Sequence, residues 1–138
     1  MKAILTTFLV FLIMSIIFSC SKEKPRSLDA YLLGKWEYIQ SIGGFTGKDT
    51  LRPPLNTTII LSLNSSQAYS ISSNGQVTKQ GTYKVINIQN FMTGSNQYGI
   101  QFDDFSSNSG LLIDFNEPIL SLSDNHYEPY GHLYRRVQ

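Results

Sequence analysis

Short apolar alternations, interrupted by turn residues, run from Leu28 to the end of the chain and limit the possible fold more than any other feature. An alternation of period two places apolar side chains on one face of a strand, and repeated short runs of this kind are typical of β-sandwiches and barrels. No segment of useful length has the period of a helix. The sequence predicts eight strands, at residues 35–42, 57–63, 67–73, 76–88, 97–105, 111–115, 119–123 and 127–137.

Turn signals connect most of these strands directly, and Asn74-Gly75 is the strongest of them. The exception is a long loop at residues 45–56, and loops of this length are often functional lids. A helical turn is expected at residues 28–33, ended by Gly34. We therefore predict an all-β domain, an eight-stranded antiparallel up-and-down barrel, because closure removes the exposed edges of an open sheet.

Strict alternation also fixes the faces of the first predicted strand. It places Trp36, Tyr38, Gln40 and Ile42 on one face and Ser41 on the other.

The beginning of the chain has no charged residue between Ala3 and Phe18, a run of 16 residues that only Lys2 precedes. This run is short for a membrane-spanning helix, which needs about 20 residues, but it suits the apolar core of a secretory signal. Ile17-Phe18-Ser19-Cys20 resembles a bacterial lipobox, of the loose kind found in Bacteroidota lipoproteins. The resemblance implies that residues 1–19 are a lipoprotein signal peptide and that Cys20 is lipidated.

The lipid would be the link between the domain and a membrane. Cys20 is the only cysteine, so no disulfide can form within the chain. Residues 20–27 form a lipidated polar tether, and residues 28–138 form the barrel domain. No aspartate follows Cys20, which by resemblance favours the outer membrane, facing either the periplasm or the cell surface. Acyl chains contribute about 0.8 kcal/mol per buried methylene, so two or three of them hold a domain firmly.

Charge gives little indication of a partner. Without residues 1–19 the chain has ten acidic and ten basic residues, so its formal net charge is zero. This balance does not favour nucleic acid as a partner, since nucleic-acid binding needs excess positive charge. We expect a monomer.

Three short motifs carry a second resemblance. Gly34-Lys35-Trp36, Gly81-Thr82-Tyr83 and Leu133-Tyr134-Arg135-Arg136-Val137 resemble, in order and spacing, the motifs of the lipocalin and lipocalin-like families, including small lipoproteins of Bacteroidota. The resemblance implies a barrel whose closing arginine packs over the tryptophan as a structural plug. We expect Trp36 to pair with Arg136, with Arg135 as the alternative. An arginine stacked on an indole gains a cation–π contact.

A lipocalin-like barrel has an interior just wide enough for side chains or one small ligand. Tyrosine combines an apolar ring with a polar tip, and eight tyrosines in a chain of this size suit a hydrophobic or amphipathic ligand. The alternative is that these residues are half-buried strand residues of a solid barrel, which would act as a protein interaction module through residues 43–56 and 87–96. The candidates to line a ligand site are Tyr38, Tyr69, Ile71, Tyr83, Tyr98, Ile100 and Phe102.

Catalytic and metal chemistry have little support. Asp124, His126 and Glu128 alternate as possible metal ligands, but they lie at a turn and lack further ligands. Asp103-Asp104, and Asp114 with Glu117, are best interpreted as solvated charges. The prediction is therefore a non-catalytic protein without a metal or cofactor.

Overall fold

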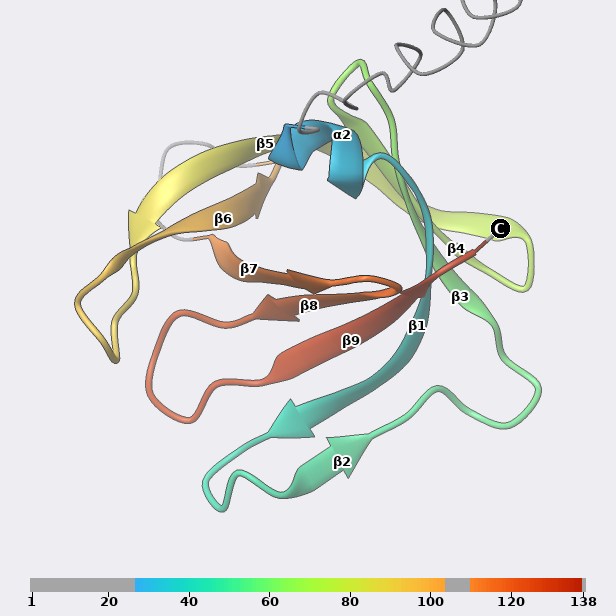
Figure 1. The fold of residues 1–138 in the computed structure, drawn as a ribbon. Coiled ribbons are helices and arrows are strands. Elements are labelled where there is room, and N and C mark those ends of the chain that lie inside the picture. Colours follow the sequence, from blue (N-terminus) through green and yellow to red (C-terminus); the bar gives the residue numbers. More distant parts are fainter. Residues whose placement is uncertain (1–26, 104–109, 138) are drawn as a thin grey trace, which may run out of the picture.

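The computed structural model describes residues 27–103 and 110–137. The predicted signal peptide and Cys20 lie outside the described residues. Within these two ranges the chain forms one short helix and nine strands (Figure 1). They are α2 (Leu28–Leu32), β1 (Gly34–Gly43), β2 (Asp49–Leu51), β3 (Ile59–Leu63), β4 (Ala68–Ser73), β5 (Gln76–Gln89), β6 (Asn96–Phe102), β7 (Leu111–Asn116), β8 (Ile119–Ser123) and β9 (Gly131–Arg136).

The strands confirm the predicted eight-stranded antiparallel barrel. β1 and β3 to β9 are joined in chain order, and β9 pairs back with β1 to close the sheet (Figure 1). β2 is an additional short strand that the sequence did not predict, because it lies within the expected loop at residues 45–56. Its three residues are exposed, and they pair with the last part of β1. A strand without an apolar face leaves no alternation to recognise.

A β-bulge in β1 corrects the predicted faces of this strand. The register with β9 shifts between Tyr38 and Gln40, so the alternation changes phase at this point. Ser41 is 3% exposed, whereas Ile42 is 38% exposed. The prediction that Gln40 and Ile42 share the face of Trp36 was therefore wrong, and Ser41 takes the inner position.

The last strand begins later than predicted. β9 starts at Gly131 because the residues before it form a loop closed by Asp124 and Tyr130. The Asp124 amide donates to the Tyr130 carbonyl at 3.0 Å, and the Tyr130 amide donates to the Asp124 carboxylate at 3.2 Å. These bonds occupy the backbone groups on both sides of residues 125–129, so the loop extends beyond the sheet.

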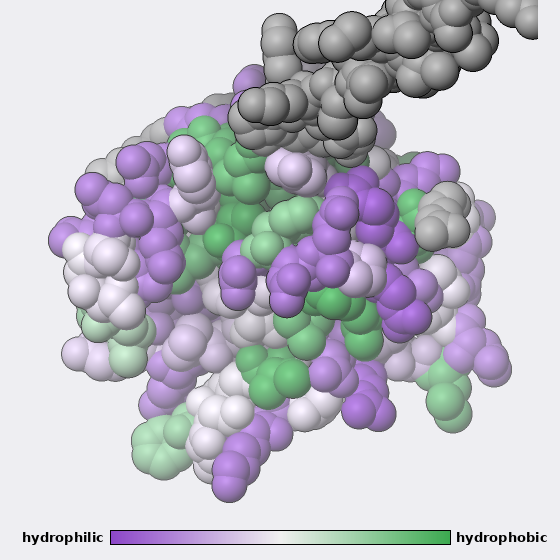
Figure 2. Space-filling view, viewed as in Figure 1, coloured by the Kyte–Doolittle hydropathy of each residue, from purple (hydrophilic) through white to green (hydrophobic). Residues whose placement is uncertain are grey.

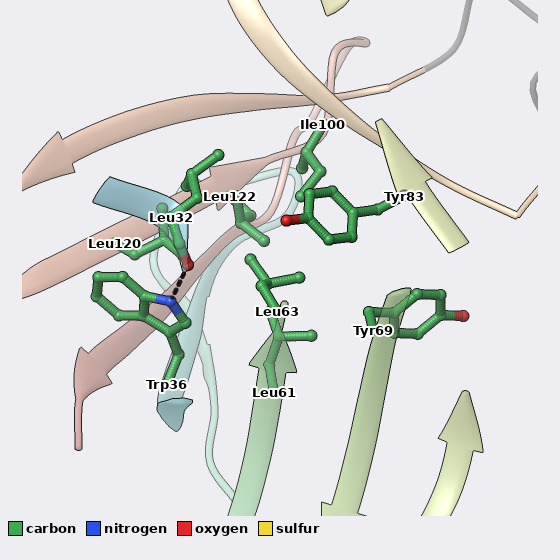
Figure 3. Packing of buried hydrophobic residues seen from close by; sticks show 9 residues of the cluster. All are labelled: Leu32, Trp36, Leu61, Leu63, Tyr69, Tyr83, Ile100, Leu120 and Leu122. Carbon is green, nitrogen blue, oxygen red and sulfur yellow. Dashed lines mark hydrogen bonds between the residues drawn. The ribbon is translucent and has the colours of Figure 1, made fainter. Parts of the chain in front are cut away.

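The apolar core fills the half of the barrel beneath α2. Ser27 caps this helix by accepting a hydrogen bond from the Ala30 amide, and Leu32 at its end is fully buried. Helix α2 thus covers one end of the barrel, called the closed end below (Figure 1). Figure 3 shows the buried cluster beneath it: Leu32, Trp36, Leu61, Leu63, Tyr69, Tyr83, Ile100, Leu120 and Leu122.

Trp36 and Arg136 join the helix to the barrel at the closed end. The Arg136 guanidinium lies 4.2 Å from the centre of the Trp36 ring. It also donates hydrogen bonds to the carbonyls of Tyr31 and Leu33, and the Trp36 indole N–H donates to the Leu32 carbonyl at 2.8 Å (Figure 3). Arg135, the alternative from sequence, is exposed. The pair therefore satisfies carbonyls that α2 leaves open at its end.

A second polar contact lies at the closed end, where Gly81 leaves room for a carboxylate. The Tyr69 hydroxyl donates to the Asp103 carboxylate at 2.6 Å, and the Lys79 ammonium lies 3.4 Å from it. The Tyr69 hydrogen bond is the main cause of a lowered pKa for Asp103, while burial and the hydrogen bond to Asp103 raise the pKa of Tyr69. The glycine of the Gly-x-Tyr motif thus has a structural explanation.

We expect Gly81→Ala to destabilise the barrel. A β-carbon at this position would overlap the Asp103 carboxylate and lie 2.9 Å from the Tyr69 ring, so both groups must move. Overpacking of this kind lowers the free energy of unfolding by about 1–3 kcal/mol. Urea denaturation measures this loss. Gly131→Ala is the matched control, since its nearest neighbour is a serine side chain at 3.3 Å. Equal stability losses in the two variants would contradict this explanation.

Candidate functional site

The end of the barrel opposite α2 lacks a helical cover in the part of the chain that the structure describes. The connections that gather at this open end are residues 44–48, 90–95 and 124–130, whereas the turn at residues 74–75 lies at the other end of β5 (Figure 1). Figure 2 shows apolar side chains gathered beneath α2, whereas the surface toward the open end is mixed in polarity. Core packing thus fills the closed half, and any recognition surface is more accessible at the open end.

The described parts of β6 and β7 share a short stretch of pairing. Among the described residues, these strands are paired at Gly99 with Leu112 and Ile100 with Leu111, whereas β5 and β6 are paired along seven residues. The two strands then diverge (Figure 1), and a cleft of about 320 Å³ lies between the loops on either side. The residues that line it are Asn90, Met92, Gln97, Leu112, Ile113, Asp114, Ser123, Asp124, Asn125, His126 and Pro129.

Asn125 connects the two loops across this cleft. Its side-chain oxygen accepts a hydrogen bond from the Phe91 amide at 2.7 Å, and its nitrogen donates to the Gln89 carbonyl at 2.9 Å. Beside this bridge the rings of Phe91 and Tyr127 meet edge to face, with centroids 4.7 Å apart. The cleft is therefore bounded by strand pairing on one side and by this bridge on the other.

The cleft contains charged groups of one sign. Asp114 and Asp124 contribute carboxylates, and none of the described residues that line the cleft is a lysine or arginine. His126 lies with Nε2 3.6 Å from the Asp124 carboxylate, and His132 lies with Nε2 3.9 Å from the same group. The two carboxylates contribute negative charge to the cleft.

A chain of polar groups lies just inside the open end. The Tyr38 hydroxyl is 2.6 Å from the Ser41 hydroxyl, which is 2.7 Å from His132 Nδ1. Serine, histidine and a carboxylate in this order are the groups of a nucleophilic triad. Ser41 is 3% exposed, however, and the 3.9 Å from His132 to Asp124 exceeds a hydrogen bond. The arrangement is best interpreted as a satisfied polar cluster that joins β1 to β9.

Tyr134 belongs to the same region. Its ring lies 5.6 Å from the ring of Tyr38, and burial raises its pKa to about 12, with a smaller contribution from Tyr38. This hydroxyl therefore stays neutral at physiological pH. The Tyr134 hydroxyl is therefore an uncharged polar group near the open end.

The predicted ligand-lining residues lie mainly in the core rather than around the cleft. Tyr69, Tyr83 and Ile100 are at most 5% exposed and belong to the buried cluster, against which Ile71 and Phe102 pack. Tyr38 is half-buried, and Tyr98 is 60% exposed. None of the seven lines the cleft. Their role as ligand contacts stays a prediction, and the packing gives the first three a structural role.

A second cavity, of about 490 Å³, lies on the outer face of β3 to β5. Short side chains such as Ser62, Ser70 and Thr82 form it, over strands that remain paired. Of the predicted ligand residues only Tyr69 contributes to its lining. The cleft between β6 and β7 is the stronger candidate, because the sheet itself opens there.

The other candidate groups from sequence do not form a site. Among the described residues no cluster of three or more histidines, cysteines or carboxylates has the arrangement of a metal site. Asp103 accepts a hydrogen bond from Tyr69 and forms an ion pair with Lys79, and Asp104 lies outside the described residues. Glu117 lies 3.8 Å from Arg136 rather than beside Asp114. The helix within the described ranges is too short to cross a membrane.

Comparisons of the chain with models of protein families, with curated proteins and with solved structures found no match. The resemblance to lipocalin-like lipoproteins therefore rests on the sequence motifs and stays a prediction.

Proposed function

We propose that this chain is a lipid-anchored protein of the outer membrane whose lipocalin-like barrel binds one small amphipathic molecule without catalysis. The lipid on Cys20 is the anchor in this proposal. The observation that carries the binding function is the cleft between β6 and β7, with apolar Met92, Leu112 and Ile113 beside polar groups.

The size and lining of the cleft support a small ligand. Its volume of about 320 Å³ lies at the lower end of the range of small-molecule sites, roughly 300–1,000 Å³. An acyl or alkyl chain can contact the apolar side chains while a polar head stays near the carboxylates and amides. The buried Ser41 and the neutral Tyr134 supply no activated nucleophile, which agrees with binding rather than catalysis.

The test is a titration of the chain from Ser21, followed by native mass spectrometry and calorimetry, with dodecyl amphiphiles below their micellar concentration. We expect a 1:1 complex. Leu112→Trp fills the cleft and should weaken binding at least about tenfold, equivalent to about 1.4 kcal/mol. Leu133→Trp, on β9 and outside the cleft, is the matched control and should leave binding unchanged. Absence of a complex, or equal effects of both variants, would reject the proposal.

A second candidate function is a protein interaction module with a solid barrel. Exposed apolar side chains in the predicted contact loops favour it: Phe45 is 85% exposed, Leu55 is 95% exposed and Met92 is 65% exposed. A single stoichiometric envelope partner, lost when residues 44–48 and 90–95 are shortened, would support this function. Retention of that partner by the shortened chain would exclude it.

A further inference from the structure

The balance of charge in the cleft differs from that of the whole chain. The mature sequence has equal numbers of acidic and basic residues, but the cleft contains Asp114 and Asp124 and neither lysine nor arginine. Asp114 is exposed and forms no ion pair with another described residue. Asp124 accepts a hydrogen bond from the Tyr130 amide, and its carboxylate lies 3.6 Å from His126 Nε2 and 3.9 Å from His132 Nε2.

Three basic residues of the described ranges make contacts outside the cleft. Arg136 is held over Trp36 at the closed end, Lys79 pairs with Asp103, and Arg52 donates to the Gln40 side chain at 3.2 Å. These contacts keep three of the cations of the described residues away from the cleft. The negative charge of the cleft is therefore available to a ligand.

Aromatic rings beside the cleft add a second feature that suits a cation. Phe91 is 52% exposed and Tyr127 is 72% exposed, and each adjoins a residue that lines the cleft. Exposed aromatic faces attract ammonium groups, most strongly where water is partly excluded. Carboxylates, aromatic faces and an apolar wall together match a molecule with a cationic head and a hydrocarbon chain.

We propose that the cleft between β6 and β7 selects amphipathic molecules with a cationic head group, of the alkylammonium class, over anionic molecules of the same chain length. This inference rests on the proposed function, because it specifies the ligand of the same cleft. The hydrocarbon chain contacts Met92, Leu112 and Ile113, and the head group lies between Asp114, Asp124 and the Phe91–Tyr127 pair.

The test compares dodecyltrimethylammonium, dodecyl sulfate and a neutral dodecyl ether, each below its micellar concentration, at pH 7.5 and low ionic strength. We expect the ammonium compound to bind at least about tenfold more tightly than the sulfate. Asp114→Asn should reduce this preference several-fold. The further change Asp124→Asn keeps an acceptor for the Tyr130 amide and should remove the rest of the preference. Asp49→Asn, on exposed β2, is the matched control and should change nothing.

The outcomes separate the two proposals. If none of the three compounds binds, the proposed function fails, and this inference fails with it. If all bind with similar affinity, or the sulfate binds best, the cleft binds amphiphiles but the charge selection is wrong. Retention of the full preference in the double variant, with its circular dichroism spectrum unchanged, would also overturn the inference.

Discussion

Replacement of Trp36 by alanine is expected to lower the free energy of unfolding by about 3–5 kcal/mol, which is the usual cost of removing a large buried aromatic side chain. Trp36 is fully buried, holds the end of α2 through its indole N–H, and contacts Phe115 edge to face at 5.8 Å. Small domains are stable by about 5–15 kcal/mol, so the variant will retain little stability. Urea denaturation followed by circular dichroism measures the loss, since the chain has no other tryptophan to report fluorescence.

Arg136→Ala and Arg135→Ala distinguish the plug from a general effect of positive charge. Arg136→Ala removes the stacking on Trp36 and leaves the Tyr31 and Leu33 carbonyls without their donor, so we expect a loss of about 1–3 kcal/mol. Arg135 is exposed on the same strand, so Arg135→Ala should lower the free energy of unfolding by less than about 0.5 kcal/mol. A larger loss for Arg135→Ala than for Arg136→Ala would contradict the assignment.

The second large effect concerns the anchor. Cys20→Ser should release the protein from the membrane fraction of a bacterial host and abolish its labelling by radioactive palmitate, because Cys20 is the only cysteine of the chain and carries the lipid in the proposed function. Two or three acyl chains supply the membrane affinity in this account, at about 0.8 kcal/mol per buried methylene.

Ser21→Ala is the matched control for this experiment, since it changes the neighbouring residue and keeps the thiol. It should leave both fractionation and labelling unchanged. A Cys20→Ser chain that remains in the membrane fraction, together with an unlabelled native chain, would show that an uncleaved apolar segment holds the protein instead.

Most of the fold could be predicted from the sequence because the barrel strands follow the alternation of apolar side chains. Leu61 and Leu63, for example, are both buried on one face of β3. The errors arose where local geometry departs from a simple strand. The bulge after Tyr38 moves Ser41 inward, and β2 forms from exposed residues through backbone pairing alone. Both features depend on how the backbone pairs, so the alternation of apolar and polar residues could not indicate either of them.

The candidate site was harder to predict than the fold. The cleft depends on where the pairing of β6 and β7 ends, and on Asn125, whose side chain reaches a loop 34 residues earlier in the chain. Asn90 and Asn125 look like ordinary turn residues in sequence. The short alternation of Asp124 and His126 was the only local signal, and it suggested metal chemistry rather than a charged cleft. Two of the tyrosines predicted to contact a ligand, Tyr69 and Tyr83, belong instead to the buried core.

The most direct test of the central claim is an NMR titration of the ¹⁵N-labelled chain from Ser21 with dodecyltrimethylammonium below its micellar concentration. We predict saturable amide shifts confined to the cleft, at Met92, Gln97, Leu112, Asp114 and Asn125, while the amides of the buried cluster around Trp36 and Leu120 stay in place. Shifts centred on the closed end or on the outer face of β3 to β5, or the absence of saturable shifts, would contradict the account.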